Sequence, residues 1–335
     1  MAVTIKDVAQ LAGVSISTVS RVINNSKPVS PAVRRKVLEA IEELDYKPNQ
    51  VARSLVTKKS NLIGIVLTDI RNYYIANMIR GIEEVGRMYD YDIILSSSYG
   101  EANREIELLE LLRSKQVEGV IFISETVSKK VLNAIKKLKI PSIYLNKYYK
   151  NNSFPSVSID NFEGAYKMTE YLKKLGHKKI LYITDNNQDN KSIEKLKIEG
   201  FKKALFESEL EDFILSVEGF EIEDGYNTGD NVIKLVEEEG ITAVFCCQDE
   251  IAIGLINYCY DNNIKVPEDI SISGYGDTEL ASIYRPGLTT VKEPYYDIGA
   301  VAIRRIIKEI DEGIVEDEDT YLPIQIIKRE STRKI

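Results

Sequence analysis

The chain has 335 residues, of which 44% are hydrophobic and 29% charged, proportions that suit a folded protein of two or three domains. No stretch approaches 18 uninterrupted apolar residues, and the first 25 residues contain no apolar signal block, so we expect no membrane span and a cytoplasmic protein. The three cysteines, Cys246, Cys247 and Cys259, cannot build a disulfide framework or a metal knuckle. We therefore expect no metal and no cofactor.

The chain contains a single histidine, His177, in "LGHKKILYI". A Ser–His–Asp or Cys–His catalytic site would depend on this one residue, whose position is typical of a surface or strand-entry histidine. There is also no GxGxxG after a first strand and no GxxxxGK[ST] phosphate loop. We predict no catalytic residues and no enzyme.

Charge is divided unevenly along the chain, whose total is −8. Residues 1–60 contain ten Lys/Arg and five Asp/Glu, a net charge of +5, which leaves −13 on residues 61–335. A small basic head on a large acidic body is typical of a DNA reader joined to a regulatory domain.

The segment "TIKDVAQLAGVSISTVSRVINN", residues 4–25, predicts a helix-turn-helix. Thr4 can cap the first helix with Asp7 in its first turn, Gly13 permits a left-handed turn, and Ser15 can cap the second helix. The inner faces are expected to be formed by Ile5, Val8, Ala9, Ala12, Val19, Val22 and Ile23.

The outer face of the second helix carries hydrogen-bonding groups and one arginine, which suits a helix in the DNA major groove. Taken alone, this face could equally be a solvated polar surface. The candidate DNA contacts in the head are Thr4, Ile16, Ser17, Thr18, Ser20, Arg21, Asn24 and Tyr46.

A third helix should begin after Ser30, with Pro31 in its first turn and an apolar stripe of Val33, Val37, Ile41 and Leu44. Pro48 then restarts the chain, and about seven residues of helical character follow. So short a helix is marginal alone in water. Residues 48–60 are therefore expected to be a hinge that orders on binding.

From residue 61 onward, apolar strands alternate with amphipathic helices, which indicates parallel sheets covered on both faces. Two such sheets make two lobes with a cleft at the carboxyl ends of their strands. The expected strands are "LIGIVL", "DIILSSS", "GVIFIS", "PSIYLN" and "SVSID" in the first lobe, and "KILYIT", "FILSV", "AVFCCQ" and "DISISGYG" in the second. The predicted fold class is α/β: an all-α helix-turn-helix head on a two-lobed, Rossmann-like, parallel-sheet body.

The stretch "YYDIGAVAIRRIIK", residues 295–308, predicts a helix with two faces. Its core side should hold Gly299, Ile303, Ile306 and Ile307. The opposite side should hold Asp297, Val301, Arg304 and Lys308. Spacing alone leaves open whether this second face meets water or a partner.

The segments "TIKDVAQLAGVSISTVSRVINN", "YKPNQVARSL", "NLIGIVLTDI", "RPGLTTV" and "KREST" resemble the lactose-repressor/galactose-repressor (LacI/GalR) family of bacterial transcription regulators. The resemblance covers essentially the whole chain. It implies a periplasmic-binding-protein type I body with chain crossovers near residues 160, 290 and 320. The implied domains are 1–47 for the head, 48–60 for the hinge and 61–335 for the body. Lobe 1 would hold about 61–160 and 290–320, and lobe 2 about 161–289 and 321–335.

In that family the hinge helices of a dimer enter the minor groove, where a leucine wedges between base pairs. The resemblance assigns that leucine to Leu55, with Asn49 and Ala52 beside it. The alternative is that Leu55 packs the linker against the body.

The same resemblance implies a small effector between the lobes, whose closure tilts the DNA heads. The implied cleft residues are Asp69, Tyr73, Asp160, Lys197, Gln248 and Asp249, each of which could instead be ordinary polar surface. Gly276 stands where the family usually has an aspartate that grips sugar hydroxyls, which argues against tight binding of a neutral sugar.

The stretches "MYDYDIILSSS" and "YYDIGAVAIRRI" are similar to a subgroup of the family that mediates carbon catabolite control, with serine-phosphorylated HPr as corepressor. In that subgroup, the positions of Arg304 and Lys308 face the phosphoserine, and those of Tyr89, Tyr296 and Asp297 supply other contacts. The resemblance thus implies a homodimeric, nucleoid-associated regulator that binds a pseudo-palindromic operator. The alternative is a repressor controlled by a small sugar or sugar phosphate alone.

Overall fold

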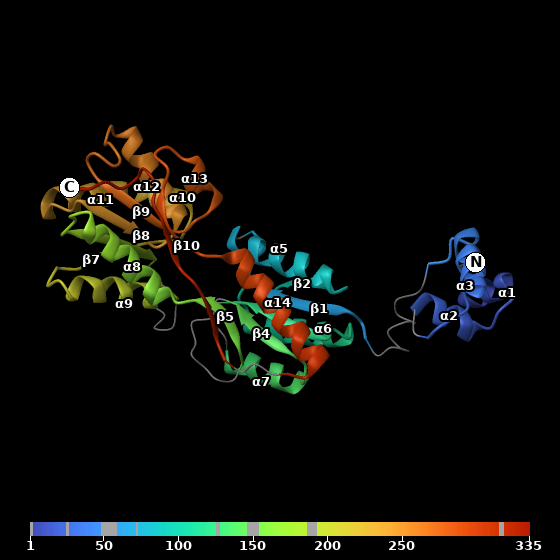
Figure 1. Ribbon diagram of the computed structural model, residues 1–335. Helices are drawn as coiled ribbons and strands as arrows, with labels where there is room; N and C mark the ends of the chain where they lie inside the picture. The colour runs from blue at the N-terminus through green and yellow to red at the C-terminus, as the bar shows by residue number, and fades with distance from the viewer. Residues whose placement is uncertain are drawn as a thin grey trace. The chain divides into compact units, whose positions relative to one another are not determined.

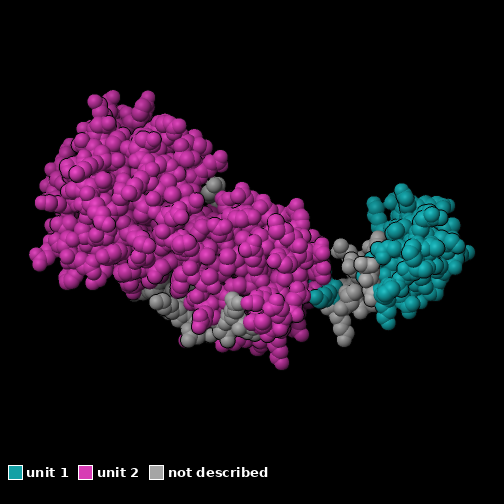
Figure 2. Space-filling model, viewed as in Figure 1, with its two compact units in different colours: residues 1–60 teal, residues 61–335 magenta. Residues whose placement is uncertain are grey.

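The computed structural model describes residues 3–24, 27–47, 59–71, 73–124, 128–145, 154–185, 193–314 and 318–335. The chain divides into two compact units, residues 1–60 and residues 61–335 (Figure 2). Within the described ranges, no helix is both long and apolar enough to cross a membrane.

The first unit is built from three helices: α1 (Ile5–Ala12), α2 (Ile16–Asn24) and α3 (Pro31–Glu43). Each places its apolar stripe inward, as the helical spacing predicts. The shared core is formed by Val8, Ala9, Ala12, Val19, Val22, Val37 and Ala40.

The caps of these helices follow the sequence with one exception. The backbone N–H and hydroxyl of Thr4 donate to the Asp7 carboxylate at 2.8 and 2.7 Å. Gly13 has a φ of 65°, and the N–H of Thr18 donates to Ser15 Oγ at 3.2 Å. Ser30 occupies the N-cap position of α3 as expected, but its side chain makes no cap hydrogen bond, and its carbonyl accepts from the N–H of Arg34.

The first lobe of the second unit has a sheet whose described strands run in the order β11-β5-β4-β3-β1-β2, all parallel. Helices α5 (Tyr73–Met88) and α14 (Tyr295–Glu312) cover one face (Figure 1). Helices α6 (Ala102–Ser114) and α7 (Lys129–Leu138) cover the other. The strands are β1 (Leu62–Leu67), β2 (Asp92–Ser97), β3 (Gly119–Ile123), β4 (Ser142–Leu145), β5 (Ser156–Ile159) and β11 (Thr320–Leu322).

The second lobe has a sheet in the order β12-β10-β9-β8-β6-β7, parallel except for β12, which is antiparallel to β10. Its strands are β6 (Ile180–Asp185), β7 (Phe213–Val217), β8 (Ala243–Cys246), β9 (Ser271–Gly276), β10 (Thr289–Lys292) and β12 (Gln325–Ile327). Its helices are α8 (Asn161–Lys174), α9 (Ile193–Phe206), α10 (Ile222–Asn227), α11 (Gly229–Glu239), α12 (Asp249–Asp261) and α13 (Glu279–Ile283).

The chain passes between the lobes three times: after β5 at Asp160, after β10 at residues 293–294, and between β11 and β12 at residues 323–324. The second and third crossings fall a few residues later than the expected 290 and 320. The difference arises because β10 and β11 each complete a sheet before the chain leaves it.

After the second crossing, α14 returns to the first lobe and lies directly on α5 (Figure 1). A Cβ atom on Gly299 would lie 2.0 Å from the carbonyl oxygen of Met78, and one on Gly81 would lie 2.1 Å from that of Tyr296. Since no side chain fits at either position, the two helix backbones are in direct contact there.

The C-terminal segment is fastened to the second lobe by buried hydrogen bonds. The Ser331 hydroxyl donates to the carbonyl of Ile272 at 2.6 Å, and His177 Nε2 lies 3.1 Å from the carbonyl oxygen of Arg333. His177 Nδ1 lies 2.9 Å from the Thr242 hydroxyl. Of the two expected positions, surface or strand entry, His177 has the second: it precedes β6 and is only 1% exposed. A neutral imidazole that donates from Nε2 satisfies both contacts.

Burial lowers the pKa of His177 below its usual 6.5. As the pH falls through 6.5, the unfolded chain therefore takes up a proton at His177, whereas the folded chain does not. Proton binding to the unfolded chain alone lowers the free energy of unfolding below this pH. The difference in free energy of unfolding between the wild type and His177→Gln should therefore shrink by about 1 kcal/mol from pH 7.5 to pH 5.5. Urea titrations at pH 7.5, 6.5 and 5.5 measure this difference, in which other titrating groups cancel. A difference that stays constant with pH would contradict the prediction.

Candidate functional site

Helix α2 presents the face that the spacing predicts. Ser17 and Arg21 are exposed, Ser20 and Asn24 are half-buried, and Val19 and Val22 are buried on the opposite side. Ile16 lies at the edge of this face and is 44% exposed. The exposed surface of α2 is thus polar, with one arginine and one apolar edge.

The candidate DNA contacts of the head differ in whether their side chains already form hydrogen bonds within the protein. The Ser15 hydroxyl lies 2.8 Å from those of both Ser17 and Thr18, and the Asn24 amide donates to Ser20 Oγ at 3.2 Å. The hydroxyl of Thr4 is used in its cap, and Tyr46 is half-buried against the head core. The hinge candidates Asn49, Ala52 and Leu55 lie outside the described residues.

Each sheet of the body has a topological switch point. In the first sheet the chain leaves β1 for β2 on one side and reaches β3 on the other; in the second, β7 and β8 flank β6 in the same way. Ligands of open parallel sheets bind at the carboxyl ends of the strands at such points. The six candidate cleft residues are therefore best judged by their partners there.

Asp69 belongs to the first lobe, and Asp160 lies at the first crossover. The Asp69 carboxylate accepts from the Arg71 guanidinium at 2.6 and 2.8 Å, which lowers the pKa of Asp69. Asp160 is the N-cap of α8 and accepts from the N–H of Glu163 at 3.0 Å. Tyr73 begins α5, and its side chain lies outside the described atoms.

Asp249 is fully buried at the start of α12, next to its half-buried N-cap Gln248. Its carboxylate accepts from the N–H of Thr278 at 2.7 Å and from the Thr290 hydroxyl at 2.5 Å. Burial raises the pKa of Asp249 to about 6 despite these bonds. This carboxylate thus joins the loop after β9 to strand β10 inside the lobe.

Gly276 lies beside this brace with a φ of 130°. A Cβ atom there would lie 3.5 Å from Asp249 Oδ2 and 3.4 Å from the Tyr295 hydroxyl. An aspartate at this position would adopt a strained backbone and bring a second carboxylate to Asp249.

Lys197 is 4% exposed, and its charge is neutralised within the protein. Its Nζ donates to Glu194 Oε1 at 2.7 Å and to the carbonyl oxygen of Cys247 at 3.0 Å, and it lies 4.1 Å from the centroid of the Tyr275 ring. The sequence analysis missed Glu194, although the i, i+3 spacing in "EKLK" was a signal that could have found it.

Helix α14 has the two faces that its spacing predicts. Ile298, Gly299, Ala300, Ala302, Ile303, Ile306 and Ile307 are buried. On the opposite side Asp297, Arg304 and Lys308 are exposed, and Val301 is half-buried.

The start of α14 is tied to α5. The Tyr296 hydroxyl donates to Glu84 Oε2 at 2.8 Å, and the Arg80 guanidinium lies 5.3 Å from the centroid of the Tyr296 ring. Further along, a Cβ atom on Gly86 would lie 3.6 Å from Ile303. The end of α5 thus meets the middle of α14 near Arg304. Tyr89, which directly follows α5, is 51% exposed. We call Tyr89, Tyr296, Asp297, Arg304 and Lys308 the α5–α14 surface.

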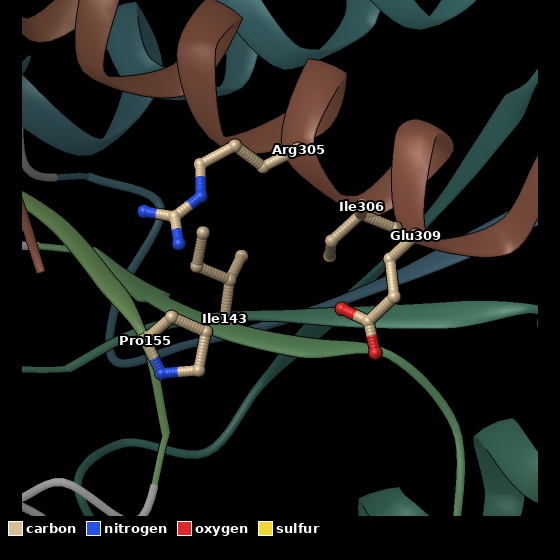
Figure 3. Close-up of a pocket in the computed structure, with 5 residues that line it drawn as sticks. All are labelled: Ile143, Pro155, Arg305, Ile306 and Glu309. Atoms are coloured by element: carbon tan, nitrogen blue, oxygen red, sulfur yellow. The ribbon is translucent and has the colours of Figure 1, made fainter. Parts of the chain in front are cut away.

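A small pocket of about 10 Å³ lies beside another side of α14 (Figure 3). Its lining residues are Ile143, Pro155, Arg305, Ile306 and Glu309. The Arg305 guanidinium donates to Thr320 Oγ1 at 2.6 Å and to the carbonyl oxygen of Glu318 at 3.0 Å. Arg305 therefore fastens β11 and the residues just before it to α14, which assigns this wall of the pocket to the packing of the first lobe.

Comparisons with known proteins agree with this architecture. Residues 4–49 match the family model of bacterial regulatory proteins, lacI family, and residues 169–332 match that of the periplasmic binding protein-like domain. Catabolite control protein A of Priestia megaterium is 40% identical over 99% of this chain and 100% of its own length. The HTH-type transcriptional regulator RegA of Clostridium saccharobutylicum is 39% identical over 99% and 100%. The chain belongs to the lacI family.

A solved structure of a lacI-family member shows the same fold. The lac repressor dimer, bound to operator and the anti-inducer ONPF, matches with a TM-score of 0.85 at 26% identity, over 99% of this chain and 100% of that one. The present lacI-family chain is accordingly a DNA-binding transcription regulator rather than an enzyme, and its helix-turn-helix head and two-lobed body are those that its sequence predicts.

The geometry of Asp249 in this lacI-family body predicts a structural role that a stability measurement can separate from ligand binding. Asp249→Ala removes the acceptor of two buried donors and should lower the free energy of unfolding by about 2–4 kcal/mol without any ligand present. Urea unfolding of the full chain tests this, with Asp160→Ala as a control at an exposed cap. Equal stability of Asp249→Ala and wild type would instead indicate that the Asp249 carboxylate does not stabilise the fold and serves to bind an effector.

Proposed function

We propose that this lacI-family regulator mediates carbon catabolite control as a homodimer, with serine-phosphorylated HPr as its corepressor. The observation that carries the proposal is the exposed cationic pair Arg304 and Lys308 on α14, whose opposite face is buried. A relative 40% identical over nearly the whole chain is named catabolite control protein A, which supports this role.

The α5–α14 surface suits a phosphorylated protein. A phosphoserine carries about −1.5 to −2 charges at neutral pH, and an arginine and a lysine one helical turn apart can both bond its oxygens. Tyr89 offers a large aromatic contact beside these cations, and Asp297 offers a carboxylate for basic groups of the partner. An exposed cationic pair on a body of charge −13 also favours a defined anionic group over a general acidic surface.

The position of α14 supports coupling between this surface and DNA. The helix begins directly after the second crossover and lies on α5, which follows the switch-point end of β1. A partner seated across both helices therefore contacts elements at the junction of the lobes. In the proposed mechanism it favours the lobe arrangement in which the paired hinges fit the operator. By linkage, operator DNA then tightens corepressor binding by the same factor.

DNA recognition is proposed to use the polar face of α2 in the major groove and the hinge residues Asn49, Ala52 and Leu55 in the minor groove. Two heads in a dimer read a pseudo-palindromic site. The regulator then acts in the cytoplasm, on the nucleoid.

The second candidate function is repression controlled by a sugar or sugar phosphate alone. The two switch points at the carboxyl ends of the sheets favour it. Against it, Asp69, Asp160, Lys197 and Asp249 already bond protein groups. This function predicts that a small molecule alone shifts operator affinity.

Arg21→Ala should weaken binding to a palindromic operator roughly tenfold to a hundredfold and reduce discrimination against a scrambled duplex, because the arginine can pair with a base edge. Fluorescence anisotropy over a range of salt concentrations measures both quantities. The control Arg35→Ala, an exposed arginine on α3, should leave the ratio of operator to scrambled affinity unchanged. Unaltered discrimination in Arg21→Ala would argue against α2 as the reader.

Arg304→Glu should abolish the enhancement of operator binding by serine-phosphorylated HPr and leave basal operator binding intact, because the substitution repels the phosphate and lies outside the head. Operator titrations with and without the phosphorylated partner measure the enhancement. Arg113→Glu is the matched control, since Arg113 is an exposed arginine of α6, on the opposite face of the same sheet. Enhancement that survives in Arg304→Glu would mean that the α14 face is only solvated.

A further inference from the structure

The switch point of the second lobe is occupied by a buried ion pair of the protein itself. Tyr182 and Thr184 belong to β6, and Cys247 directly follows β8, so these residues mark the carboxyl ends of the two strands between which a ligand is expected. Glu194 and Lys197, one turn apart on α9, lie against them at 8% and 4% exposure.

Both charges of this pair are surrounded by partners. Glu194 Oε1 accepts from Lys197, while Oε2 accepts from the hydroxyls of Tyr182 at 3.3 Å and Thr184 at 3.4 Å. Lys197 also donates to the Cys247 carbonyl and stacks over Tyr275. Burial alone lowers the pKa of Lys197, but the carboxylates of Glu194 and Glu293 more than reverse this, so the pKa lies above its usual value and the ammonium stays charged.

An anionic ligand at this switch point would have to take Lys197 away from Glu194. The Glu194 carboxylate would then remain buried without a counter-ion, and removing one partner of a buried pair is strongly unfavourable. A neutral residue at position 194 would lower this barrier, because Lys197 would lose the carboxylate to which it donates, while the charge of Glu293 would remain nearby.

We propose that Glu194 is a built-in counter-ion of Lys197 at the switch point of the second lobe and excludes phosphorylated ligands from it. Specificity here arises from a repulsive group rather than from an added attractive one. The inference concerns the cleft alone and does not depend on the α5–α14 surface, so a titration with serine-phosphorylated HPr can fail or succeed independently of it.

The test is isothermal titration calorimetry of the full chain with glucose 6-phosphate, and in parallel with glucose. Glu194→Gln keeps the size and the acceptor oxygen of the side chain while removing its charge. It should bind glucose 6-phosphate at least about tenfold more tightly than the wild type, because Lys197 loses the carboxylate to which it donates. Adding Lys197→Gln should reverse the gain, and the affinity for glucose should be the same in all variants.

Two outcomes would overturn the proposal. One is wild-type binding of glucose 6-phosphate as tight as that of Glu194→Gln. The other is a gain in Glu194→Gln that persists when Lys197 is also replaced. If Glu194→Gln does not fold, as judged by circular dichroism, wild type and Lys197→Gln still decide. If the wild type binds glucose 6-phosphate and Lys197→Gln does not, the proposed role of Glu194 is refuted. Equally weak or absent binding of glucose 6-phosphate by both proteins supports it.

Discussion

The arrangement of the body depends on the backbone contact between α5 and α14. Gly81 and Gly299 leave no room for a side chain at this contact, so the helix that follows β10 of the second lobe is held on the first lobe. The outer face of α14 carries Arg304 and Lys308, and Tyr89 directly follows α5, while the inner faces of the two helices complete the core of the first lobe. One close approach therefore joins the lobes and sets the spacing of the exposed cations, because a helix pair packed through glycines cannot slide without clashing.

Buried polar and charged side chains are the second organising feature. In the second lobe, three of them have hydrogen-bond partners within the protein. Asp249 accepts two hydrogen bonds, Lys197 is paired with Glu194, and His177 is held neutral between Thr242 and Arg333. An unpaired charge inside a protein costs several kcal/mol, so polar residues that enter a sheet edge acquire internal partners. In this lobe the expected ligand contacts thus serve the protein's own structure, whereas the exposed cations of α14 remain on the surface. This contrast is the physical reason to favour a protein corepressor over a small effector.

Local sequence patterns were enough for much of the fold and for part of the site. The capping pair Thr4–Asp7, the turn at Gly13 and the two faces of α14 were predicted because each depends on residues within a few positions along the chain. Ser30 took the expected N-cap position without a side-chain cap bond, which the residue type alone does not decide. The LacI/GalR resemblance supplied the two-lobed order of the body, which periodicity alone indicated only as alternating strands and helices.

The sequence by itself determined the helix-turn-helix head, the parallel-sheet body and the charged stripe on α14, since these follow from spacing, composition and family motifs. Only the tertiary structure decided which polar side chains are free to meet a partner. The groups that bury Lys197, Asp249 and His177 come from strands and loops many positions away, such as Thr290 for Asp249 and Arg333 for His177. Parallel strands bring together residues that are distant in sequence, so the partners of a buried polar group cannot be found from its neighbours in the chain.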